Sequence, residues 1–338
     1  GSLLLELYAK YGEYAALRSM PSWDGLLLVE RRLLLTGKDV CLNKFVKSSN
    51  VVGTCMATLH PHSDASIYGT LVRMVKAGFF DGQGNFGAPG LVPIPPAAMR
   101  YTEVRLKSIM KPFFEYLPFV PKVEFEASEE PAYLPAPFPL LLGDKGCKLG
   151  LSFFKSSVPV FDSLTTLKTI QLRILGKQPL DDIVPYYEGY RVVSVKGSLF
   201  RDHKSDVVFE VLHEQDDSSL ILYGVPSRSK ITHLVETAKL SVEEETGRDG
   251  IKIRLRFPKN QTLDSKTLES ILRTEIKYEV HIYDLLEMTP KKTTVENMFV
   301  KMWELYVSCT DKFIKWNIAQ LENKLKELDI LIVAKEVL

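Results

Sequence analysis

The strongest constraint on the fold lies in the C-terminal segment, from about Thr293 to Leu338. Apolar residues recur there at steps of three and four in two successive stripes: Phe299, Met302, Tyr306, Cys309, Phe313 and Trp316, then Ile314, Ile318, Leu321, Leu325, Leu328 and Ile332. This spacing predicts one long helix. A heptad-like seam of this length normally faces another helix, so we expect a coiled-coil arm, although no partner helix is evident in the chain.

The remainder has the composition of a globular protein. Its 338 residues are enough for two or three domains. With 45% apolar and 25% charged residues, its composition excludes wholesale disorder and the fibrous classes. No apolar run reaches the roughly 20 residues of a membrane helix. The four cysteines show no C-x-x-C spacing, so neither a zinc site nor a disulfide framework is indicated. Gly1 and Ser2 are interpreted as a cloning remnant without a signal peptide, and we expect a cytoplasmic protein.

Three regimes follow one another along the chain. Residues 1–128 are helical and punctuated by glycine, with helices expected from about Leu4 to Ser19, from near Leu26 and from near Ala65, and a loop over 81–100. An acidic, proline-rich connector opens the second regime, residues 129–292. Strands are expected there at 190–196, 207–213, 220–225 and 251–257, with helices at 230–240 and 264–275, which is typical of an α+β domain. Residues 293–338 form the third.

Charge is distributed unevenly, although 43 basic and 42 acidic side chains nearly cancel overall. From Arg31 to Lys111, eleven Lys or Arg face four Asp or Glu, a net charge of +7. Such a cluster is either a phosphate-binding face or a solvated basic surface. Charge alone does not decide between them.

The most informative stretch is 53–105, which contains HPHSD (60–64), DGQGNFG (81–87) and AAMRYTEVR (97–105). Tyr101 follows Arg100 directly. A phenol has a pKa of about 10 and is a poor nucleophile unless a cation stabilises its phenolate. Arg100 is placed to do this, and other arginines could neutralise a phosphate under attack. Any single Arg–Tyr pair is otherwise an ordinary surface feature.

These motifs, in this order, resemble those of the A-type chains of type IIA DNA topoisomerases, the gyrase and topoisomerase IV family. DGQGNFG and AAMRYTE match the family strings unchanged, HPHSD is similar to H-P-H-G-D, and RSMPSWDGLLLVERRLLL (18–35) is similar to the family's helix-opening motif. EEPAYLPA (129–136) and EEETGRDGIKI (243–253) resemble segments of the family's tower domain.

The resemblance implies a fold and a mechanism. It implies a winged-helix (CAP-like) DNA-gate domain at 1–128, an α/β tower domain at 129–292 and a coiled-coil arm at 293–338. Tyr101 would attack a DNA phosphodiester and hold the 5′ end, with Arg100, Arg31 and His62 as further catalytic residues. The DNA backbone would be held by the basic or histidine side chains of Arg32, Lys47, His60 and Arg105.

The resemblance also implies partners. The family's D-x-D metal cluster and an ATP-binding glycine motif are missing from the sequence, so Mg²⁺ and ATP would be bound by a B-type subunit rather than by this chain. The expected assembly is a homodimer through the winged-helix domains, acting on double-stranded DNA with that subunit. This chain alone is not expected to cleave DNA, and no membrane partner is expected.

Departures from the family pattern lie at several positions. Glu30 precedes Arg31, and Leu27 and Asn50 stand where the family has basic residues, so the cradle for DNA is less basic. Cys147 takes the place of an isoleucine that wedges between base pairs and bends the DNA, and offers less surface for it.

In drug-sensitive members a serine and, one turn later, an acid hold a magnesium ion that a fluoroquinolone chelates; Ala65 and Gly69 stand at these two positions. In the family, a dimerising knob and a returning helix follow the long helix. The sequence ends before them, so we expect either a piece of a longer protein or a compact phage or viral enzyme.

Three functions are compatible with the sequence. The first is the DNA-cleaving subunit of an ATP-dependent type IIA topoisomerase, which breaks both strands, passes a duplex and religates them. The second is an inactive DNA-binding structural homologue, against which the intact Arg100–Tyr101 pair argues. The third is an α+β binding module with a coiled-coil arm, against which the ordered motifs argue.

Overall fold

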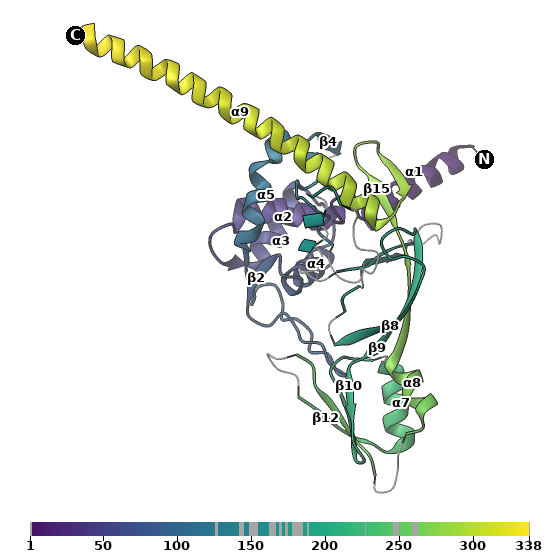
Figure 1. Cartoon of the computed structure of the whole chain (residues 1–338). Coiled ribbons are helices and arrows are strands. Elements are labelled where there is room, and N and C mark those ends of the chain that lie inside the picture. Colours follow the sequence, from purple (N-terminus) through teal and green to yellow (C-terminus); the bar gives the residue numbers. More distant parts are fainter. Residues whose placement is uncertain are drawn as a thin grey trace.

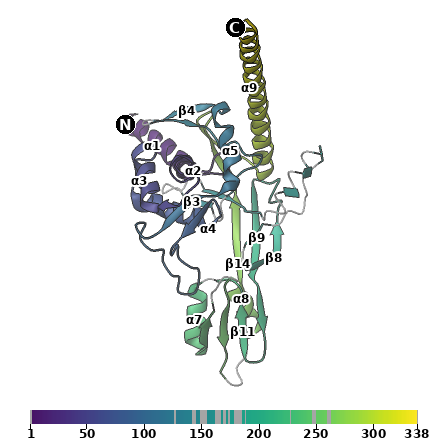
Figure 2. The same ribbon diagram turned by 90° about the vertical axis from the view of Figure 1, so that its left-hand side faces the viewer.

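The computed structural model of the chain describes residues 2–125, 128–141, 145–148, 155–161, 167–168, 171–172, 175–177, 185–187, 189–226, 228–245, 250–258 and 263–337. An N-terminal lobe packs beside an elongated central sheet, which leads down to a lower lobe (Figure 1, Figure 2). A long helix projects from the body at the opposite end from the lower lobe.

The N-terminal lobe combines helices with short strands. Its elements are α1 (Ser2–Ser19), α2 (Leu28–Val40), β1 (Val46–Lys47), α3 (Ser48–Thr58), α4 (Asp64–Lys76), β2 (Phe80–Gln83), β3 (Glu103–Leu106), a 3₁₀ turn (Ser108–Met110), α5 (Lys111–Glu115), a second 3₁₀ turn (Leu117–Phe119), β4 (Lys122–Phe125) and β5 (Ser128–Pro131). Strands β1, β3 and β2 form a small antiparallel sheet in that order, and β4 pairs with β5.

Helix α2 shows how the sequence builds this lobe. The Glu30 carboxylate accepts the backbone N–H of Leu27 at 2.8 Å, which satisfies a free donor at the start of the helix. Leu33 and Leu34 are fully buried and pack with apolar side chains of α3, α4 and β3. One core therefore joins α2, α3 and α4 to the three-stranded sheet, and fixes the loops between them.

The central sheet and the lower lobe account for most of the strands. The central sheet has the order β6-β7-β14-β9-β8, with β6 (Lys145–Lys148), β7 (Lys155–Val158), β8 (Tyr190–Lys196), β9 (Lys204–Val211) and β14 (Arg273–Glu279). The lower lobe has the sheet β10-β11-β13-β12 and two helices: β10 (His213–Gln215), β11 (Ser219–Leu222), β12 (Ser241–Glu244), β13 (Ile253–Arg256), α7 (Arg228–Ala238) and α8 (Ser265–Leu272).

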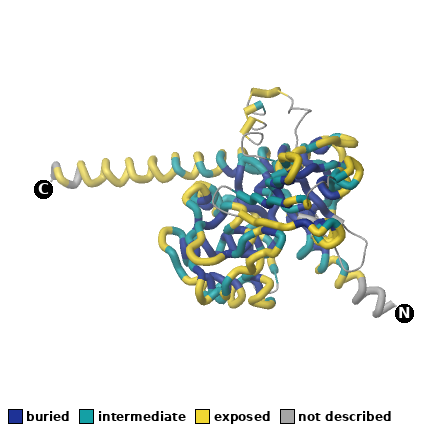
Figure 3. The backbone as a smooth tube through the Cα atoms, turned by 90° about the horizontal axis from the view of Figure 1, so that it is seen from below, coloured by how far each residue is buried: buried dark blue, intermediate teal, exposed yellow. Residues whose placement is uncertain are grey.

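A hairpin connects the central sheet to the long helix. Strands β15 (His281–Asp284) and β16 (Thr289–Lys292) pair antiparallel, and α9 (Val295–Val337) follows at once. Val295, Met298 and Met302 are fully buried at the root of α9. Further along, the helix leaves the body and its apolar stripe is exposed, as at Leu321 and Leu325 (Figure 3). The expected long helix is therefore present, while its pairing into a coiled coil stays a prediction.

The mixture of helices and small sheets confirms the predicted α+β class. One local prediction was wrong at its end. The helix expected over 264–275 ends at Leu272, because from Arg273 the chain pairs with β9, where Arg273 donates to Glu210 at 2.8 Å. The segment expected as loop over 81–100 contains no helix, and only its first three residues belong to a strand, β2. Within the described residues no helix is both long and apolar enough to cross a bilayer. The finer winged-helix and tower assignments stay predictions.

Candidate functional site

Tyr101 lies on an exposed turn immediately before β3. Its side chain is 63% exposed, and its backbone N–H donates to the carbonyl of Ala98 at 2.9 Å. The Arg100 guanidinium lies over the Tyr101 ring, 4.6 Å from the centroid. Among the described residues Arg100 makes no ion pair with a carboxylate. The phenol and an uncompensated cation are thus presented together to the solvent.

The next residue, Thr102, fixes this turn to the core. It is fully buried, and its hydroxyl lies 3.0 Å from the Tyr68 hydroxyl and donates to the Ser48 hydroxyl at 2.8 Å. The Ser48 N–H donates to the Thr102 carbonyl at 2.9 Å, and Tyr68 donates to the Ala97 carbonyl at 2.7 Å. Helices α3 and α4 therefore hold the backbone on both sides of Tyr101.

The DGQGNFG segment supports the same turn from its other side. Gly84 has φ +101°, and a Cβ there would lie 3.2 Å from the carbonyl oxygen of Tyr101. Only glycine combines this backbone conformation with so close an approach. At Gly84 the segment therefore packs directly against the backbone of the tyrosine turn.

The loop that follows Gly87 reaches the lower lobe. It descends from β2 toward β10 and β12 (Figure 1), and Leu91 packs against the apolar core of the lower lobe. This contact explains why the loop is apolar. It also ties the lobe that carries Tyr101 to a second part of the molecule.

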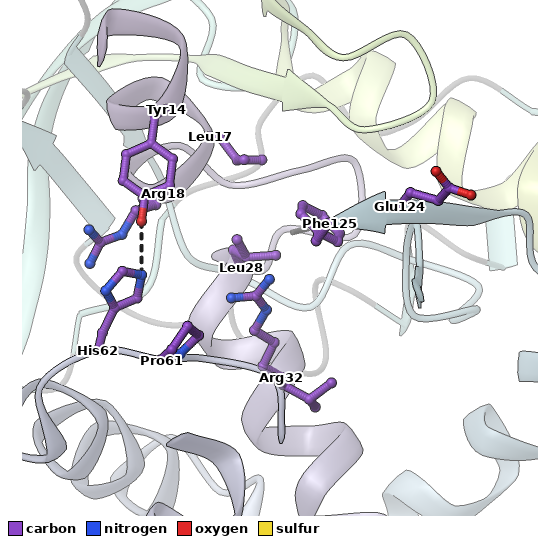
Figure 4. A pocket seen from close by; sticks show the side chains of 10 residues that line it. Tyr14, Leu17, Arg18, Leu28, Arg32, Pro61, His62, Glu124 and Phe125 are labelled. Carbon is purple, nitrogen blue, oxygen red and sulfur yellow. Dashed lines mark hydrogen bonds between the residues drawn. The ribbon is translucent and has the colours of Figure 1, made fainter. Parts of the chain in front are cut away.

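A second set of polar side chains lines a cavity of about 470 Å³ between α1, α2 and the loop before α4 (Figure 4). Tyr14 and Arg18 come from α1, Arg32 from α2, and His62 from the loop. The Tyr14 hydroxyl and His62 Nε2 are hydrogen bonded at 3.0 Å. An adjoining cavity of about 510 Å³ shares Tyr14 and Arg18.

Cations set the electrostatics of the two histidines. Arg32 Nη1 donates to His60 Nδ1 at 2.9 Å, so this nitrogen carries no hydrogen. Burial, together with the charges of Arg32, His62 and Arg18, lowers the pKa of His60 to about 3. Burial and the charges of Arg18 and Arg32 also lower the pKa of His62. Both imidazoles are neutral at pH 7, surrounded by positive charge that favours an anion.

The two arginines of the RR pair in α2 are buried in ion pairs. Arg31 is 1% exposed and donates to both oxygens of Asp24, each at 2.8 Å. Asp24 also accepts the N–H groups of Leu26 and Leu134. This guanidinium is enclosed and bonded to Asp24, and the expected contact of Arg31 with a scissile phosphate stays a prediction.

Arg32 is held at the edge of the cavity. It pairs with the buried Glu130 at 2.7 Å, and its guanidinium lies 5.1 Å from the Phe125 ring centroid. Arg32 therefore bridges β5 and the histidine loop, with one edge toward the cavity (Figure 4).

Lys47 and Arg105 lie on the small sheet beside Tyr101, as expected for surface cations. Lys47 pairs with Glu103 at 2.8 Å, and Arg105 pairs with Asp81 at 2.9 Å. All four side chains are partly exposed, so a phosphate can compete with either carboxylate. Neither cavity is lined by Tyr101 or Arg100.

Sequence reasoning did not single out Arg18 or Tyr14. Arg18 lines both cavities, stands 5.3 Å from the Tyr14 ring centroid, and among the described residues makes no ion pair with a carboxylate. A signal was present, because Arg18 opens the RSMPSWDG segment. Tyr14 carries no motif and is recognised only through its bond to His62.

Two predicted features lie outside the described residues. The backbone of Cys147 pairs with Ser156 in the β6–β7 ladder, but the Cys147 side chain is not described. Residues 246–249 of the EEETGRDG segment are likewise not described.

A family model for the A-type chain of DNA gyrase and topoisomerase IV matches residues 18–337. The chain belongs to this family. The gyrase A protein of Mycoplasma pneumoniae is 28% identical over 382 residues, covering 98% of this chain and 44% of that protein. The gyrase A protein of Haloquadratum walsbyi is 29% identical over 300 residues, covering 77% of this chain and 34% of that protein.

The gyrase A protein of Mycolicibacterium smegmatis is 39% identical over 166 residues, covering 44% of this chain and 19% of that protein. The chain thus spans less than half the length of these gyrase relatives. The matched range nevertheless includes the exposed Arg100–Tyr101 turn, the root of α9, and Arg18 and His62 of the cavity, whereas Tyr14 precedes it.

Proposed function

We propose that this chain is the DNA-cleaving part of an ATP-dependent type IIA topoisomerase. The observation that carries the proposal is the Tyr101 phenol, exposed on a rigid turn with the Arg100 guanidinium over its ring. A hydroxyl that must reach a DNA backbone needs this exposure, and a side chain that must meet one phosphorus atom needs a fixed backbone.

The reaction is a transfer between two esters. The Tyr101 oxygen attacks the phosphorus, the bond to the 3′ oxygen breaks, and the 3′ hydroxyl leaves with a proton. The 5′ phosphate stays bound to Tyr101 as a phosphodiester, so religation is the same step reversed and needs no new energy source. Arg100 stabilises the phenolate and the negative charge that grows on the phosphate.

The cavity around His62 supplies further groups that can hold a phosphate. Among the described residues Arg18 makes no ion pair with a carboxylate, and His62 is a neutral imidazole that can donate a hydrogen bond to a phosphate oxygen. Because Tyr101 does not line this cavity, we infer that the two halves combine between the subunits of a homodimer. Each Tyr101 would then act on a phosphate held by the other protomer's Arg18 and His62.

The remaining cations would hold the neighbouring backbone. Lys47 and Arg105 exchange their carboxylate partners for phosphates, while Arg32 and His60 stay paired and support the cavity wall. Contacts of this kind are made to the DNA backbone, so sequence preference is weak. Arg31 supports α2 through its ion pair with Asp24.

Mg²⁺ and ATP belong to the proposed assembly. The carboxylates near Tyr101 in the described part of the chain, Asp81 and Glu103, are each paired with a cation, so they do not form a vacant acidic cluster. This donor set does not fit a catalytic Mg²⁺. We therefore propose that a B-type subunit supplies both Mg²⁺ and the ATPase, in an assembly of two copies of each chain.

The arrangement of elements supports the proposed domains. Helices α2, α3 and α4 with the sheet β1-β3-β2 suit a winged-helix gate at 1–128. The central sheet and the lower lobe suit a tower at 129–292, and α9 suits the arm at 293–338. We place the working protein on DNA in the cytoplasm.

Covalent trapping tests the proposal. The chain, its B-type partner, Mg²⁺ and end-labelled duplex are mixed, denatured and separated by electrophoresis. We expect protein-linked 5′ ends with the unsubstituted chain and none with Tyr101→Phe, which keeps the ring and loses only the nucleophile. DNA binding by the two proteins should agree. Linkage that persists in Tyr101→Phe would overturn the assignment, and binding without linkage in the unsubstituted chain would support the inactive homologue.

A further inference from the structure

Three metal-ligating side chains converge where β9, β14 and β15 meet, away from Tyr101 and from the cavity around His62. They are His203, Glu279 and His281, all half-buried, and their ligand atoms lie within 4.8 Å of one another. None of the three belongs to a motif recognised in the sequence, and the proposed DNA cleavage does not use them.

Backbone hydrogen bonds hold all three residues. Lys204 pairs with Glu279 in the ladder between β9 and β14, and the N–H of Val280 donates to the carbonyl of His203 at 3.0 Å. The Ser156 hydroxyl donates to the carbonyl of His281 at 2.6 Å. Val280 is buried between Glu279 and His281, so the two flanking side chains project on the opposite side of the extended chain. The cluster is built into the sheet.

The orientation of His203 resembles that of a metal ligand. Its Nδ1 lies 3.2 Å from the carbonyl oxygen of Thr293. Because a carbonyl only accepts, Nδ1 carries the hydrogen, which leaves Nε2 facing a Glu279 oxygen at 3.5 Å. Metal-bound histidines are commonly fixed through the other ring nitrogen in this way. Two ligands about 2.1 Å from one tetrahedral ion lie about 3.4 Å apart, close to this spacing.

The charges in the cluster leave room for a cation. Lys204 Nζ lies 2.9 Å from one Glu279 oxygen, and its side chain is 65% exposed. It can therefore turn into the solvent when a metal ion takes its place.

We propose that His203, Glu279 and His281 bind one transition-metal cation of the zinc type, with a solvent molecule completing the coordination. Two imidazoles and one carboxylate suit Zn²⁺, whereas Mg²⁺ and Ca²⁺ prefer oxygen ligands alone. Thr293 lies two residues before α9 begins, so the ion fastens the central sheet to the root of the long helix. The ion has a structural role that is independent of the cleavage site.

The test is metal binding by the untagged chain after treatment with a chelator. Zn²⁺ is titrated in competition with a chromophoric indicator, and Co²⁺ is added separately so that its visible spectrum reports the ligands. The variants are His203→Gln and His281→Gln. His213→Gln is the matched control, because the Nδ1 of His213 also meets a carbonyl, that of Val211, at 3.0 Å, but in β10, outside the cluster.

We expect one Zn²⁺ per chain with a Kd of about 1 µM or tighter. His203→Gln and His281→Gln should weaken binding by more than the roughly 10- to 100-fold that loss of an outer hydrogen-bond partner costs, and His213→Gln should not weaken it. Bound Zn²⁺ should also raise the Tm of the chain.

Circular dichroism checks that each variant is folded. If a cluster variant does not fold, the unsubstituted chain still decides, because Co²⁺ must give one equivalent of a tetrahedral or five-coordinate nitrogen and oxygen spectrum. Absence of Zn²⁺ binding at micromolar concentration would overturn the site, as would unchanged binding in folded His281→Gln. In that case the cluster is an ordinary hydrogen-bonded pair of histidines around Glu279.

Discussion

The tyrosine turn and the histidine cavity differ in almost every physical property. Tyr101 and Arg100 project from a turn into solvent, whereas His60 and Arg32 are buried and held by fixed partners. The first region has a nucleophile and one cation. The second has uncharged imidazoles, the Tyr14 phenol bonded to His62, and Arg18, which makes no ion pair with a carboxylate among the described residues. Since Tyr101 lines neither cavity, the proposed reaction needs the two regions to meet between protomers.

The arginines of the N-terminal lobe differ in the same way. Arg31 and Arg32 are locked to Asp24 and Glu130, while Arg18 and Arg100 rest against aromatic rings. A buried pair that loses one member leaves an uncompensated charge and costs stability. Arg100 is exposed and Arg18 is half-buried, and neither pairs with a carboxylate among the described residues, so removing either should cost little stability and a loss of cleavage that follows is functional.

Mixed dimers give the largest expected effect. Tyr101→Phe and Arg18→Ala homodimers should each lose cleavage, the first completely and the second by about 10²- to 10³-fold, as when one charge-stabilising group is removed. In a mixed dimer, one centre joins the intact Tyr101 to the intact Arg18, and the other has neither. Cleavage of one strand should therefore return, measured as nicked, protein-linked DNA.

The control is a mixed dimer in which one chain carries both substitutions and the other carries none. If the two groups combine between protomers, neither centre of this dimer has both an intact Tyr101 and an intact Arg18, so the dimer should not nick DNA. If instead the double variant nicks while the mixed single variants stay inactive, the two regions act within one chain and the inference of a shared site is wrong.

Stability separates an arginine in a buried ion pair, Arg31, from the half-buried Arg18, which makes no ion pair among the described residues. Arg31→Met should lower the free energy of unfolding by about 3–5 kcal/mol, because Asp24 is left buried without its partner. Arg18→Met should change it by no more than about 0.5 kcal/mol. Urea denaturation of the unbound chain measures both. Equal losses would mean that Arg18 is as structural as Arg31, and its unpaired state would carry no functional meaning.

The sequence predicted the tyrosine turn better than the cavity. Tyr101, Arg100 and the glycines that support them are contiguous strings, and local strings are readable without a fold. Tyr14 lines the cavity and bonds to His62, and Glu130 holds Arg32 at its edge; these contacts join residues 48 and 98 positions apart in the chain.

The environments of Arg31 and Arg32 could not be predicted from the sequence for a related reason. The family resemblance implied DNA contacts for both, but successive residues of a helix point about 100° apart. Arg31 therefore faces the core and Asp24, while Arg32 faces the cavity rim. Burial of one of two adjacent cations is decided by packing, and no local pattern indicates it. The same applies to β14, where pairing with β9 ended a predicted helix at Leu272.

A drug test sharpens the description of the cavity. Ala65 and Gly69 of α4 line the cavity of about 510 Å³ beside Arg18. They lie one turn apart, and a Cβ at Gly69 meets nothing within 4 Å. The family resemblance assigns these positions to the magnesium bridge of fluoroquinolones. Ala65→Ser with Gly69→Asp should therefore strengthen trapping of cleavage complexes about 10- to 100-fold, as one charge-assisted hydrogen bond allows.

The matched control is Ala65→Ser with Gly69→Asn, which keeps the size and removes the charge. It should recover only a small part of the gain. Equal trapping by the unsubstituted chain and by the Ser–Asp variant would show that the bridge does not operate at this cavity.

The smallest expected effect concerns acid stability of the cavity. His60 has a pKa of about 3 in the folded chain, mainly through burial, against about 6.5 when unfolded. Between these values the unfolded chain binds the extra proton, so stability is present above about pH 6.5 and is lost as the pH falls. From pH 6.5 to 4.5 this amounts to about 1–2 kcal/mol, allowing for relaxation around Arg32.

His60→Gln isolates this contribution. Glutamine keeps an acceptor for Arg32 but does not titrate, so the free energy of unfolding should fall less steeply with acid than in the unsubstituted chain. Urea denaturation at several pH values between 4.5 and 7 gives the two slopes. The tyrosine turn has no buried histidine, and Tyr101→Phe should leave the slope unchanged. Parallel curves for the unsubstituted chain and His60→Gln would mean that His60 gains its proton without loss of the fold. The cavity would then be as open to water as the turn, and the contrast between the two regions would rest on the arginines alone.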